Sequence, residues 1–269
     1  MTSWGLICGL PVVEERKNPM YNVTMTKELL ASMIDHTMLS QCAGIKDIVK
    51  LCSEAKKYSF ASVCVNPIYV PLAYSELNGS DVKVCTVIGF PLGSTTSVDK
   101  ANETLVAVAN GASEVDMVIN VGAALDCRFS EIELDISAVV HAASLAGQKC
   151  GRKITVKVIL ETCYLDDQTI QTCCQCAVRA GADFVKTSTG FAMPKGVDGQ
   201  LLSNGASVHH VELMRTVVGP SFGVKASGGI RNAKNCLNML ASGANRIGTS
   251  SGVQIIDSWD ESVKVPRWD

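Results

Sequence analysis

The chain has 269 residues, a length that suits one large α/β domain, and 47% of them are hydrophobic although only 5% are aromatic. This composition favours a core of small aliphatic side chains around buried parallel strands. The net charge of −2 gives no bias toward nucleic acid or an anionic membrane surface, and no apolar run reaches the ~18 residues of a membrane span.

The predicted elements alternate regularly along the chain, after an expected N-terminal extension (residues 1–25) and a short helix near 27–31. Short β-branched or apolar runs, typical of buried strands, lie at 32–36, 61–66, 82–89, 114–120, 154–161, 184–187, 223–226 and 246–248. Segments with helical spacing lie between them at 44–58, 67–77, 97–110, 130–148, 167–180, 207–218 and 233–242. Strand and helix units without a break in composition predict a single (β/α)8 TIM barrel over residues 26–258, followed by a C-terminal tail over 259–269.

The rival fold is a doubly wound open sheet, in which a glycine-rich fingerprint usually follows the first strand. Here the first strand ends in Asp35-His36-Thr37, and no G-x-G-x-x-G motif lies near it. The barrel is therefore favoured. The strands of a barrel end at one common mouth, where active sites of this fold lie, so the polar residues at those ends are the candidates.

Three lysines lie inside otherwise apolar strands and are predicted to converge on the mouth. Lys157 alternates with valines in VKVIL, so it points away from them and into the barrel. Lys186 in FVKTS and Lys225 in GVKAS hold equivalent positions on adjacent strands, which lie ~4.8 Å apart in a sheet. The sequence thus predicts two ammonium groups within several ångströms of each other.

Such proximity changes the chemistry of a lysine. A free lysine has a pKa of ~10.4, and bringing that pKa to ~7 requires ~4.6 kcal/mol of bias against the charged form. A second cation ~5 Å away supplies ~3 kcal/mol at an effective dielectric of ~20, and partial desolvation can supply the rest. The pattern predicts an amine nucleophile that forms a Schiff base with a carbonyl. The alternative is that the lysines are structural and pair with Asp35, Asp116 or Glu161.

Two glycine-containing turns are typical of anion-binding loops. SGGIR (residues 227–231) follows the seventh predicted strand, and GTSSG (residues 248–252) follows the eighth and opens a short helix. Glycines let backbone N–H groups approach a phosphate, and barrels commonly bind phosphate after strands seven and eight. With Gly190 near the Lys186 strand, these turns predict a phosphate site, although ordinary turns use the same residues.

Seven segments in one order resemble a known family: VCVNP, VIGFPLG, EVDMVIN, VKVILET, FVKTSTGF, VKASGGIR and RIGTSSG. They span about residues 33–251 and resemble the deoxyribose-phosphate aldolases, with FVKTSTGF beside VKASGGIR as the most specific pair. The resemblance implies a class I lyase, without metal or other cofactor, that reversibly cleaves 2-deoxy-D-ribose 5-phosphate to D-glyceraldehyde 3-phosphate and acetaldehyde in deoxynucleoside catabolism. It implies phosphosugar and aldehyde partners, no nucleic acid or membrane, and a homodimer as the expected assembly.

The resemblance also implies roles for residues at matching positions. Lys186 would form the Schiff base, and Lys225 would be the neighbouring cation that helps to keep that amine neutral. Asp116 would take part in a proton relay, and Lys157 would help to handle the carbinolamine. The substrate-pocket and phosphate positions match Asp35, Cys64, Thr189, Gly190, Gly228, Gly229, Arg231, Gly248, Ser250 and Ser251. Some relatives carry a tail tyrosine that assists proton exchange, whereas this chain ends in VPRWD, so slower exchange is expected if a tail contributes.

The remaining cysteines and histidines are not assigned to the site. The twelve cysteines lie scattered and mostly in apolar segments, which predicts free thiols in the reducing cytoplasm rather than a disulfide framework. CCQC, residues 173–176, lies within a predicted helix and lacks a second cysteine pair, so helix thiols are favoured over zinc. His209 and His210 are expected to be surface residues, and His36 is a weaker candidate for a substrate contact.

Three other functions would use the same phosphate loops and stay open. One is a related phosphosugar lyase or transaldolase-like enzyme that accepts a ketose donor. Another is a barrel isomerase in which Lys157 and Asp116 act as acid and base without a covalent step. The third is an inactive phosphosugar-binding protein, against which the intact set of Lys186, Lys225 and Asp116 argues.

Overall fold

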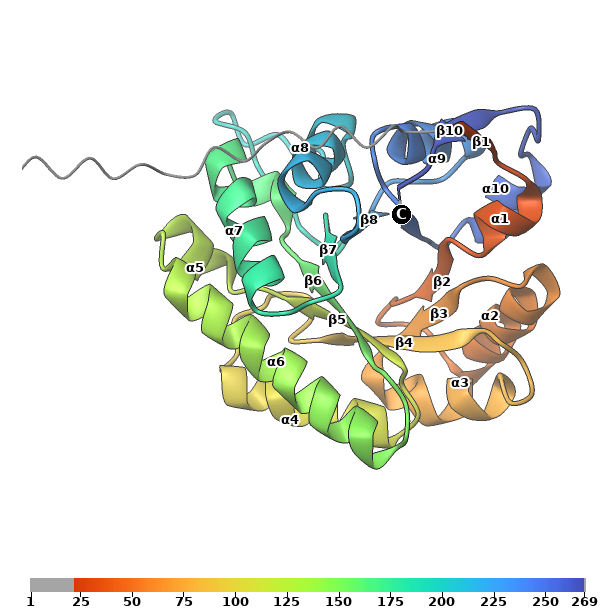
Figure 1. The fold of residues 1–269 in the computed structure, drawn as a ribbon, viewed down its shortest axis with the longest axis horizontal. Helices are drawn as coiled ribbons and strands as arrows, with labels where there is room; N and C mark the ends of the chain where they lie inside the picture. Colours follow the sequence, from red (N-terminus) through yellow and green to blue (C-terminus); the bar gives the residue numbers. More distant parts are fainter. Residues whose placement is uncertain (1–21, 269) are drawn as a thin grey trace, which may run out of the picture.

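Eight parallel strands close into a barrel in the computed structural model, which describes residues 22–268 (Figure 1). In order around the barrel they are β2 (Ile34–Met38), β3 (Ser62–Val65), β4 (Lys83–Ile88), β5 (Glu114–Val118), β6 (Thr155–Ile159), β7 (Phe184–Lys186), β8 (Gly223–Ser227) and β9 (Arg246–Thr249). β9 pairs with β2 and closes the ring. The predicted (β/α)8 TIM barrel is confirmed.

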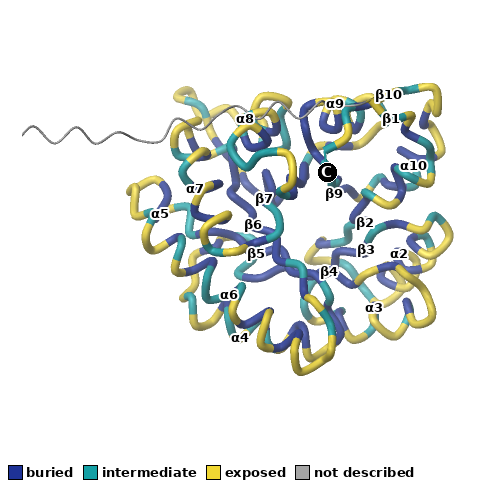
Figure 2. Tube along the Cα trace, in the orientation of Figure 1, coloured by how far each residue is buried: buried dark blue, intermediate teal, exposed yellow. Residues whose placement is uncertain are grey.

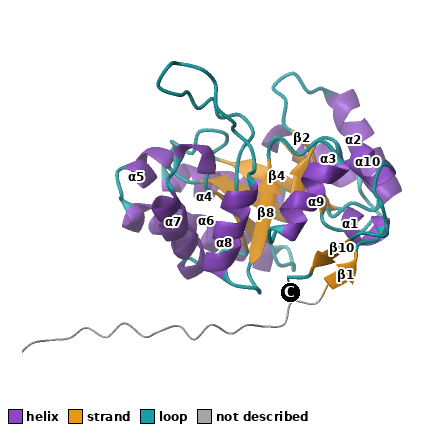
Figure 3. Ribbon diagram, turned by 90° about the horizontal axis from the view of Figure 1, so that it is seen from above, coloured by secondary structure: helices purple, strands orange, loops and turns teal. Residues whose placement is uncertain are grey.

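Helices surround the barrel and cover the outer face of its strands (Figures 1 and 3). The long ones are α2 (Ile45–Tyr58), α3 (Val70–Glu76), α4 (Ser97–Ala109), α6 (Phe129–Lys149), α7 (Asp167–Arg179), α8 (Val208–Val218) and α9 (Ala233–Ala241). The short ones are α5 (Val121–Leu125), α10 (Gly252–Asp257) and the 3₁₀ helices η1 (Pro67–Tyr69) and η2 (Thr162–Tyr164). Helix α5 was not predicted; it begins where the Asn120 side chain accepts a hydrogen bond from the Ala123 backbone N–H.

The two ends of the described chain meet beside the barrel. β1 (Asn22–Thr24) pairs antiparallel with β10 (Lys264–Pro266), next to α1 (Lys27–Ala31) and α9. The buried indole of Trp259 donates a hydrogen bond to the Met25 carbonyl at 2.7 Å. The last residues of the predicted extension therefore pack against the predicted tail. Residues 1–21 lie outside the described part, and the proposed boundaries after residues 25 and 258 stay predictions.

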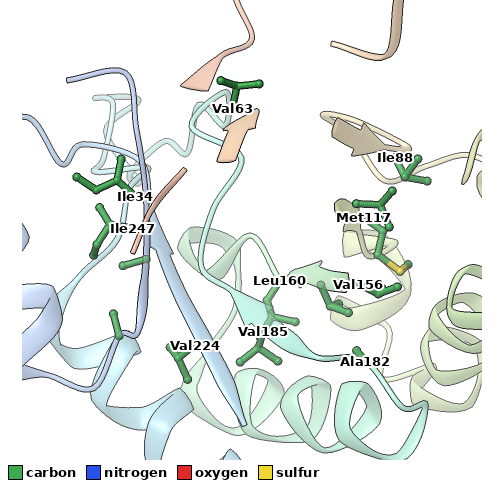
Figure 4. Close-up of a cluster of buried hydrophobic side chains, with 14 of the residues drawn as sticks. Ile34, Val63, Ile88, Met117, Val156, Leu160, Ala182, Val185, Val224 and Ile247 are labelled. Carbon is green, nitrogen blue, oxygen red and sulfur yellow. The ribbon is translucent and has the colours of Figure 1, made fainter. Parts of the chain in front are cut away.

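The apolar core lies between the strands and the helices (Figures 2 and 4). Val156 and Val158 of β6 belong to this core, whereas the fully buried Lys157 between them points to the other side of the sheet and contacts residues of the barrel interior. Strand alternation explains this arrangement, because successive side chains face opposite sides of a sheet. The barrel interior is therefore free to hold charged side chains.

The cysteines of the described residues are free thiols. Cys173, Cys174 and Cys176 are buried thiols of α7, which agrees with the prediction that they lie within a helix. None of the described helices is long and apolar enough to cross a membrane.

Candidate active site

A cavity of about 750 Å³ lies at the carboxyl ends of β2, β7, β8 and β9. Of the predicted site residues, it brings together Lys186, Thr189, Gly190, Gly228, Gly229, Arg231, Gly248 and Ser250. A further part of its wall is the end of β2 and the segment that follows, residues 37–42, which the sequence-based prediction missed. That segment has no glycine turn and no charged side chain, so no motif marks it in the sequence.

The other predicted pocket residues lie elsewhere. Asp35 and Cys64 do not line the cavity, because both side chains are fully buried in the barrel interior. Ser251 lines a neighbouring cavity beside α2 and α10 instead. His36 also faces that second cavity: its Nε2 lies 2.8 Å from a Glu54 carboxylate oxygen of α2. His36 follows the inward-facing Asp35 in β2, so alternation turns it away from the barrel interior.

Asp116 of β5 lies at the centre of the three lysines. Lys186 and Lys225 are paired across β7 and β8, and the Nζ atoms of both lie 2.7 Å from Asp116 Oδ2. The Lys157 Nζ lies 2.9 Å from Asp116 Oδ1. One buried carboxylate therefore joins the three amines.

Two further carboxylates and an arginine complete this charge cluster. Lys225 also contacts Asp35, and the Lys157 Nζ lies 2.5 Å from a Glu114 oxygen and 3.7 Å from Asp35. Arg246 contacts the other side of Asp35 at 2.7 Å and Glu114 at 3.4 Å. The cluster therefore has one cation more than it has carboxylates. Its cations are Lys157, Lys186, Lys225 and Arg246, and its carboxylates are Asp35, Glu114 and Asp116.

These contacts shift the protonation equilibria. Burial by itself would raise the pKa of Asp116, but Lys157, Lys186 and Lys225 hold it well below its usual range. Burial favours the neutral form of Lys225, yet Asp116 and Asp35 raise the pKa of Lys225 above its usual value. The pKa of Lys157 is also raised, since its carboxylate neighbours outweigh the effect of burial. The sequence argument considered a bare pair of cations; in the structure a carboxylate lies between them.

The number of carboxylate contacts distinguishes the three lysines. Lys157 has three, Lys225 has two, and Lys186 has one, to Asp116. Lys186 is also the one of the three that lines the cavity. The alternative of paired, structural lysines describes Lys157 and Lys225 well. Lys186 is the amine that faces the cavity.

Two thiols lie against the acidic centre. Cys64 and Cys85 are paired across β3 and β4, and Cys85 Sγ lies 3.2 Å from Asp116 Oδ1 and 3.4 Å from the Lys157 Nζ. The hydrogen bond from Cys85 lowers the pKa of the Cys64 thiol, whereas burial raises that of Cys85. Donor atoms of Cys64, Cys85 and Asp116 lie within 4.8 Å of one another. A metal ion there would have to displace the lysines from Asp116, so the charges disfavour it.

Glycines at the mouth make room for the lysine and for close backbone approach. A Cβ on Gly248 would lie 2.2 Å from Ser227 Oγ and 3.0 Å from Lys225 Cε, so no larger residue fits beside this lysine. Gly228 has φ +87°, a conformation that favours glycine, and a Cβ there would lie 2.9 Å from Gly205 Cα. Both positions therefore require glycine for reasons of shape.

A buried carboxylate ties two loops of the mouth together. The Thr189 backbone N–H donates to Glu161 Oε1 at 3.1 Å, and the Thr189 hydroxyl donates to the other oxygen. Burial raises the pKa of Glu161. Nearby, the Met193 backbone N–H donates to the Tyr164 hydroxyl at 3.0 Å. The loop after β6 thereby positions the loop that follows Lys186.

The sequence-based prediction missed Glu114, Arg246 and Cys85 as members of the cluster. A signal was present, because Glu114 and Asp116 are two residues apart on one strand and must face the same side. Arg246 and Gly248 have the same spacing on β9. Contacts between strands that are not neighbours cannot be predicted from these local patterns. The contact between Lys186 of β7 and Asp116 of β5 is an example.

A parallel (β/α)8 barrel with a lysine amine beside a carboxylate at its mouth is the architecture of a barrel enzyme that can use an amine nucleophile. The family model described as "DeoC/LacD family aldolase" matches residues 29–257. The chain belongs to this family and is an aldolase, that is, a carbon–carbon lyase. The family expected from the seven segments is confirmed.

Curated relatives match over most of their length. A deoxyribose-phosphate aldolase of Geobacillus sp. is 53% identical over 228 residues, which cover 85% of this chain and 95% of the relative. One of Thermoanaerobacter sp. is 50% identical over 232 residues, covering 86% and 97%. Among solved structures, the tetrameric deoxyribose phosphate aldolase of Aeropyrum pernix has a TM-score of 0.75 at 35% identity, covering 87% of this chain and 92% of that one.

Proposed function

We propose that the chain is a deoxyribose-phosphate aldolase that cleaves 2-deoxy-D-ribose 5-phosphate through a Schiff base on Lys186. The names of the relatives support the reaction. The observation that carries the mechanism is the Lys186 amine, which lines the 750 Å³ cavity and lies 2.7 Å from Asp116. A net positive charge in a buried cluster is costly, and loss of one lysine proton would neutralise it. Lys186 is the amine placed to attack once it is neutral.

The first half of the reaction forms the imine. The neutral Lys186 amine attacks the C1 aldehyde, and the resulting carbinolamine loses water to give an iminium ion. Asp116 contacts Lys186 directly and can move the protons that this dehydration requires. Lys157 contacts Asp116 and does not line the cavity, so we assign it a positioning role for Asp116 rather than direct contact with the carbinolamine.

The second half breaks the carbon–carbon bond. The iminium accepts the electron pair of the C2–C3 bond as the C3 hydroxyl loses its proton, which releases D-glyceraldehyde 3-phosphate and leaves an enamine. The acceptor of that proton is Asp116, through Lys225 or a water molecule, and the same relay returns a proton to the enamine carbon. Water then hydrolyses the imine and releases acetaldehyde. Ser227 Oγ, buried in the cavity wall without a hydrogen-bond partner among the described residues, suits a sugar hydroxyl.

The isomerase alternative is less well supported. It would require Lys157 to act on substrate as an acid or base, yet Lys157 does not line the cavity and contacts three carboxylates. The residue that does reach the cavity is a lysine with one carboxylate contact, which suits a nucleophile better than an acid.

The phosphate is expected to bind at the turns after β8 and β9, with Arg231 as the charged partner. Replacing Arg231 by glutamine is expected to lower kcat/KM for 2-deoxyribose 5-phosphate about tenfold, since a hydrogen bond to a charged group contributes about 1.5 kcal/mol. The value for unphosphorylated 2-deoxyribose should not change. The measurement is kcat/KM for both sugars, with Arg179→Gln, at the far end of α7, as the matched control. Equal losses for the two sugars would rule out a phosphate contact.

The cellular compartment and the oligomeric assembly of the enzyme are also part of the proposal. Free thiols throughout the described core suit a reducing compartment, which supports a cytoplasmic location. Deoxynucleoside catabolism is the pathway that we propose for the reaction. A homodimer remains the expected assembly; the Aeropyrum pernix relative is described as tetrameric.

A further inference from the structure

A second group of functional side chains lies outside the catalytic cavity, where α7 and α8 begin. Asp167 is the first residue of α7, and His209 and His210 lie in the first turn of α8. One carboxylate oxygen and one ring nitrogen of each histidine lie within 4.8 Å of one another. None of the three lines the catalytic cavity. The sequence-based prediction treated the two histidines as surface residues of a predicted helix. The fold brings Asp167, which is 42 positions away from His209, beside them.

The present contacts of this cluster leave one histidine unsatisfied. His209 Nε2 lies 2.8 and 2.9 Å from the two oxygens of Asp167. His210 Nδ1 is buried and has no hydrogen-bond partner among residues 22–268, a state that is rare for a buried polar atom. The histidine and the carboxylate are the usual donors for Zn²⁺ and its neighbours in the transition series. An ion bound by Asp167 and by one ring nitrogen of each histidine would replace the exposed His209–Asp167 contact.

We propose that Asp167, His209 and His210 form a binding site for a divalent transition-metal ion of the Zn²⁺ type, with water in the remaining coordination positions. Both helix starts are held in place: the Asp166 side chain accepts from the Thr169 N–H, and the Ser207 side chain accepts from the His210 N–H. The backbone that carries the donors is thus fixed before an ion binds, and only side-chain rotations are needed to close the site.

The charges around the cluster permit such an ion. The carboxylate of Asp167 supplies one negative charge. The first turns of two helices carry partial positive charge, which opposes a cation. The site is therefore expected to be weaker than a structural zinc site that has four protein ligands.

The position of the site gives the ion a structural effect. The segment before α7 contains Tyr164, and the segment before α8 contains Thr189 and Met193, which are already joined by the Glu161–Thr189 and Tyr164–Met193 hydrogen bonds. An ion between Asp167 and the two histidines would join the helices that follow these loops. Binding to the folded state alone raises its stability by mass action, so the ion is expected to raise Tm.

The test uses the full chain and Zn²⁺ as the probe, followed by calorimetric titration and thermal unfolding. Because exposed thiols such as Cys42, Cys127 and Cys150 also bind Zn²⁺, a parallel titration with Co²⁺ reports the ligand type: nitrogen and oxygen donors give weak visible bands without the intense thiolate charge-transfer band. The wild-type chain is expected to bind one Co²⁺ without that band and to gain Tm with Zn²⁺.

Variants at the cluster distinguish metal binding at this site from metal binding at the exposed thiols. His210→Gln and His209→Gln are expected to bind at least tenfold more weakly and to lose the Tm gain, while the exposed His141→Gln, on α6, behaves as wild type. Unchanged aldolase activity and metal-free Tm of the cluster variants would show that they fold. Binding of equal strength in all the variants, or a Co²⁺ spectrum dominated by thiolate, would refute the site. Neither outcome bears on the proposed aldolase reaction, since these residues lie outside its cavity.

Discussion

Replacing Lys186 by leucine is expected to lower kcat by at least about 10⁴-fold, because loss of a covalent nucleophile removes the reaction path itself. The fold should survive the change. Lys186 is one cation of a cluster that has one more cation than carboxylates, so its removal leaves the remaining charges balanced. Asp116 keeps its contacts with Lys157 and Lys225.

The measurement is the rate of D-glyceraldehyde 3-phosphate formation from 2-deoxyribose 5-phosphate, with thermal unfolding as the check on folding. Lys153→Leu is the matched control, since Lys153 is an exposed lysine whose pairing with Asp183 contributes at most about 1 kcal/mol. A folded Lys186→Leu protein that kept a tenth of the wild-type rate would show that the reaction does not pass through this amine.

The second large effect is expected for Asp116→Asn, which keeps the shape of the side chain and removes its charge. Activity should fall by about 10²- to 10⁴-fold, the usual contribution of a residue that moves protons. The variant should also lose about 3–5 kcal/mol of stability, because Lys157, Lys186 and Lys225 lose the carboxylate that joins them. Asp126→Asn, at an exposed carboxylate, is the control for the loss of one negative charge.

The pH dependence of unfolding distinguishes this explanation from a general loss of packing. In the wild type the pKa values of Lys157 and Lys225 are raised, so the folded state binds more protons than the unfolded state, and stability falls as the pH rises through and above ~10.4. In the Asn variant Lys157 keeps Glu114 and Asp35, and Lys225 keeps Asp35, but each loses one carboxylate. Their pKa values are therefore raised less than in the wild type, and stability should fall less steeply as the pH rises above ~10.4. A variant whose stability falls as steeply as that of the wild type above ~10.4 would contradict this account of the cluster.

Much of the fold can be derived from local patterns. β-branched runs alternate with helical segments, and each predicted run overlaps a strand of the barrel. The inward position of Lys157 follows from its alternation with valines, since a parallel barrel strand must bury its apolar side against helices. The pairing of β1 with β10 could not be derived, because both strands have only three residues and are far apart in the chain. Such short segments carry little periodicity.

The site could be predicted less completely than the fold. The residue types at the ends of the strands identify the mouth, and the equivalent positions of Lys186 and Lys225 follow from register. Contacts across the barrel do not follow from either rule. Asp116 reaches Lys186 over an intervening strand, and Arg246 reaches Glu114 across the interior, so the partners depend on barrel geometry and side-chain length. Asp35, which the resemblance implied as a pocket residue, is found beneath the pocket, bound to Lys225 and Arg246.

The central claim is that Lys186 forms an imine with its substrate, and reductive trapping tests it most directly. The protein would be incubated with acetaldehyde or 2-deoxyribose 5-phosphate, reduced with borohydride, digested, and analysed by mass spectrometry. With acetaldehyde we expect an ethyl group on Lys186, no ethyl group on Lys157 or Lys225, and no adduct in Lys186→Leu. An active protein that yields no adduct, or one in which the adduct lies on a different lysine, would contradict the assignment of Lys186 as the nucleophile.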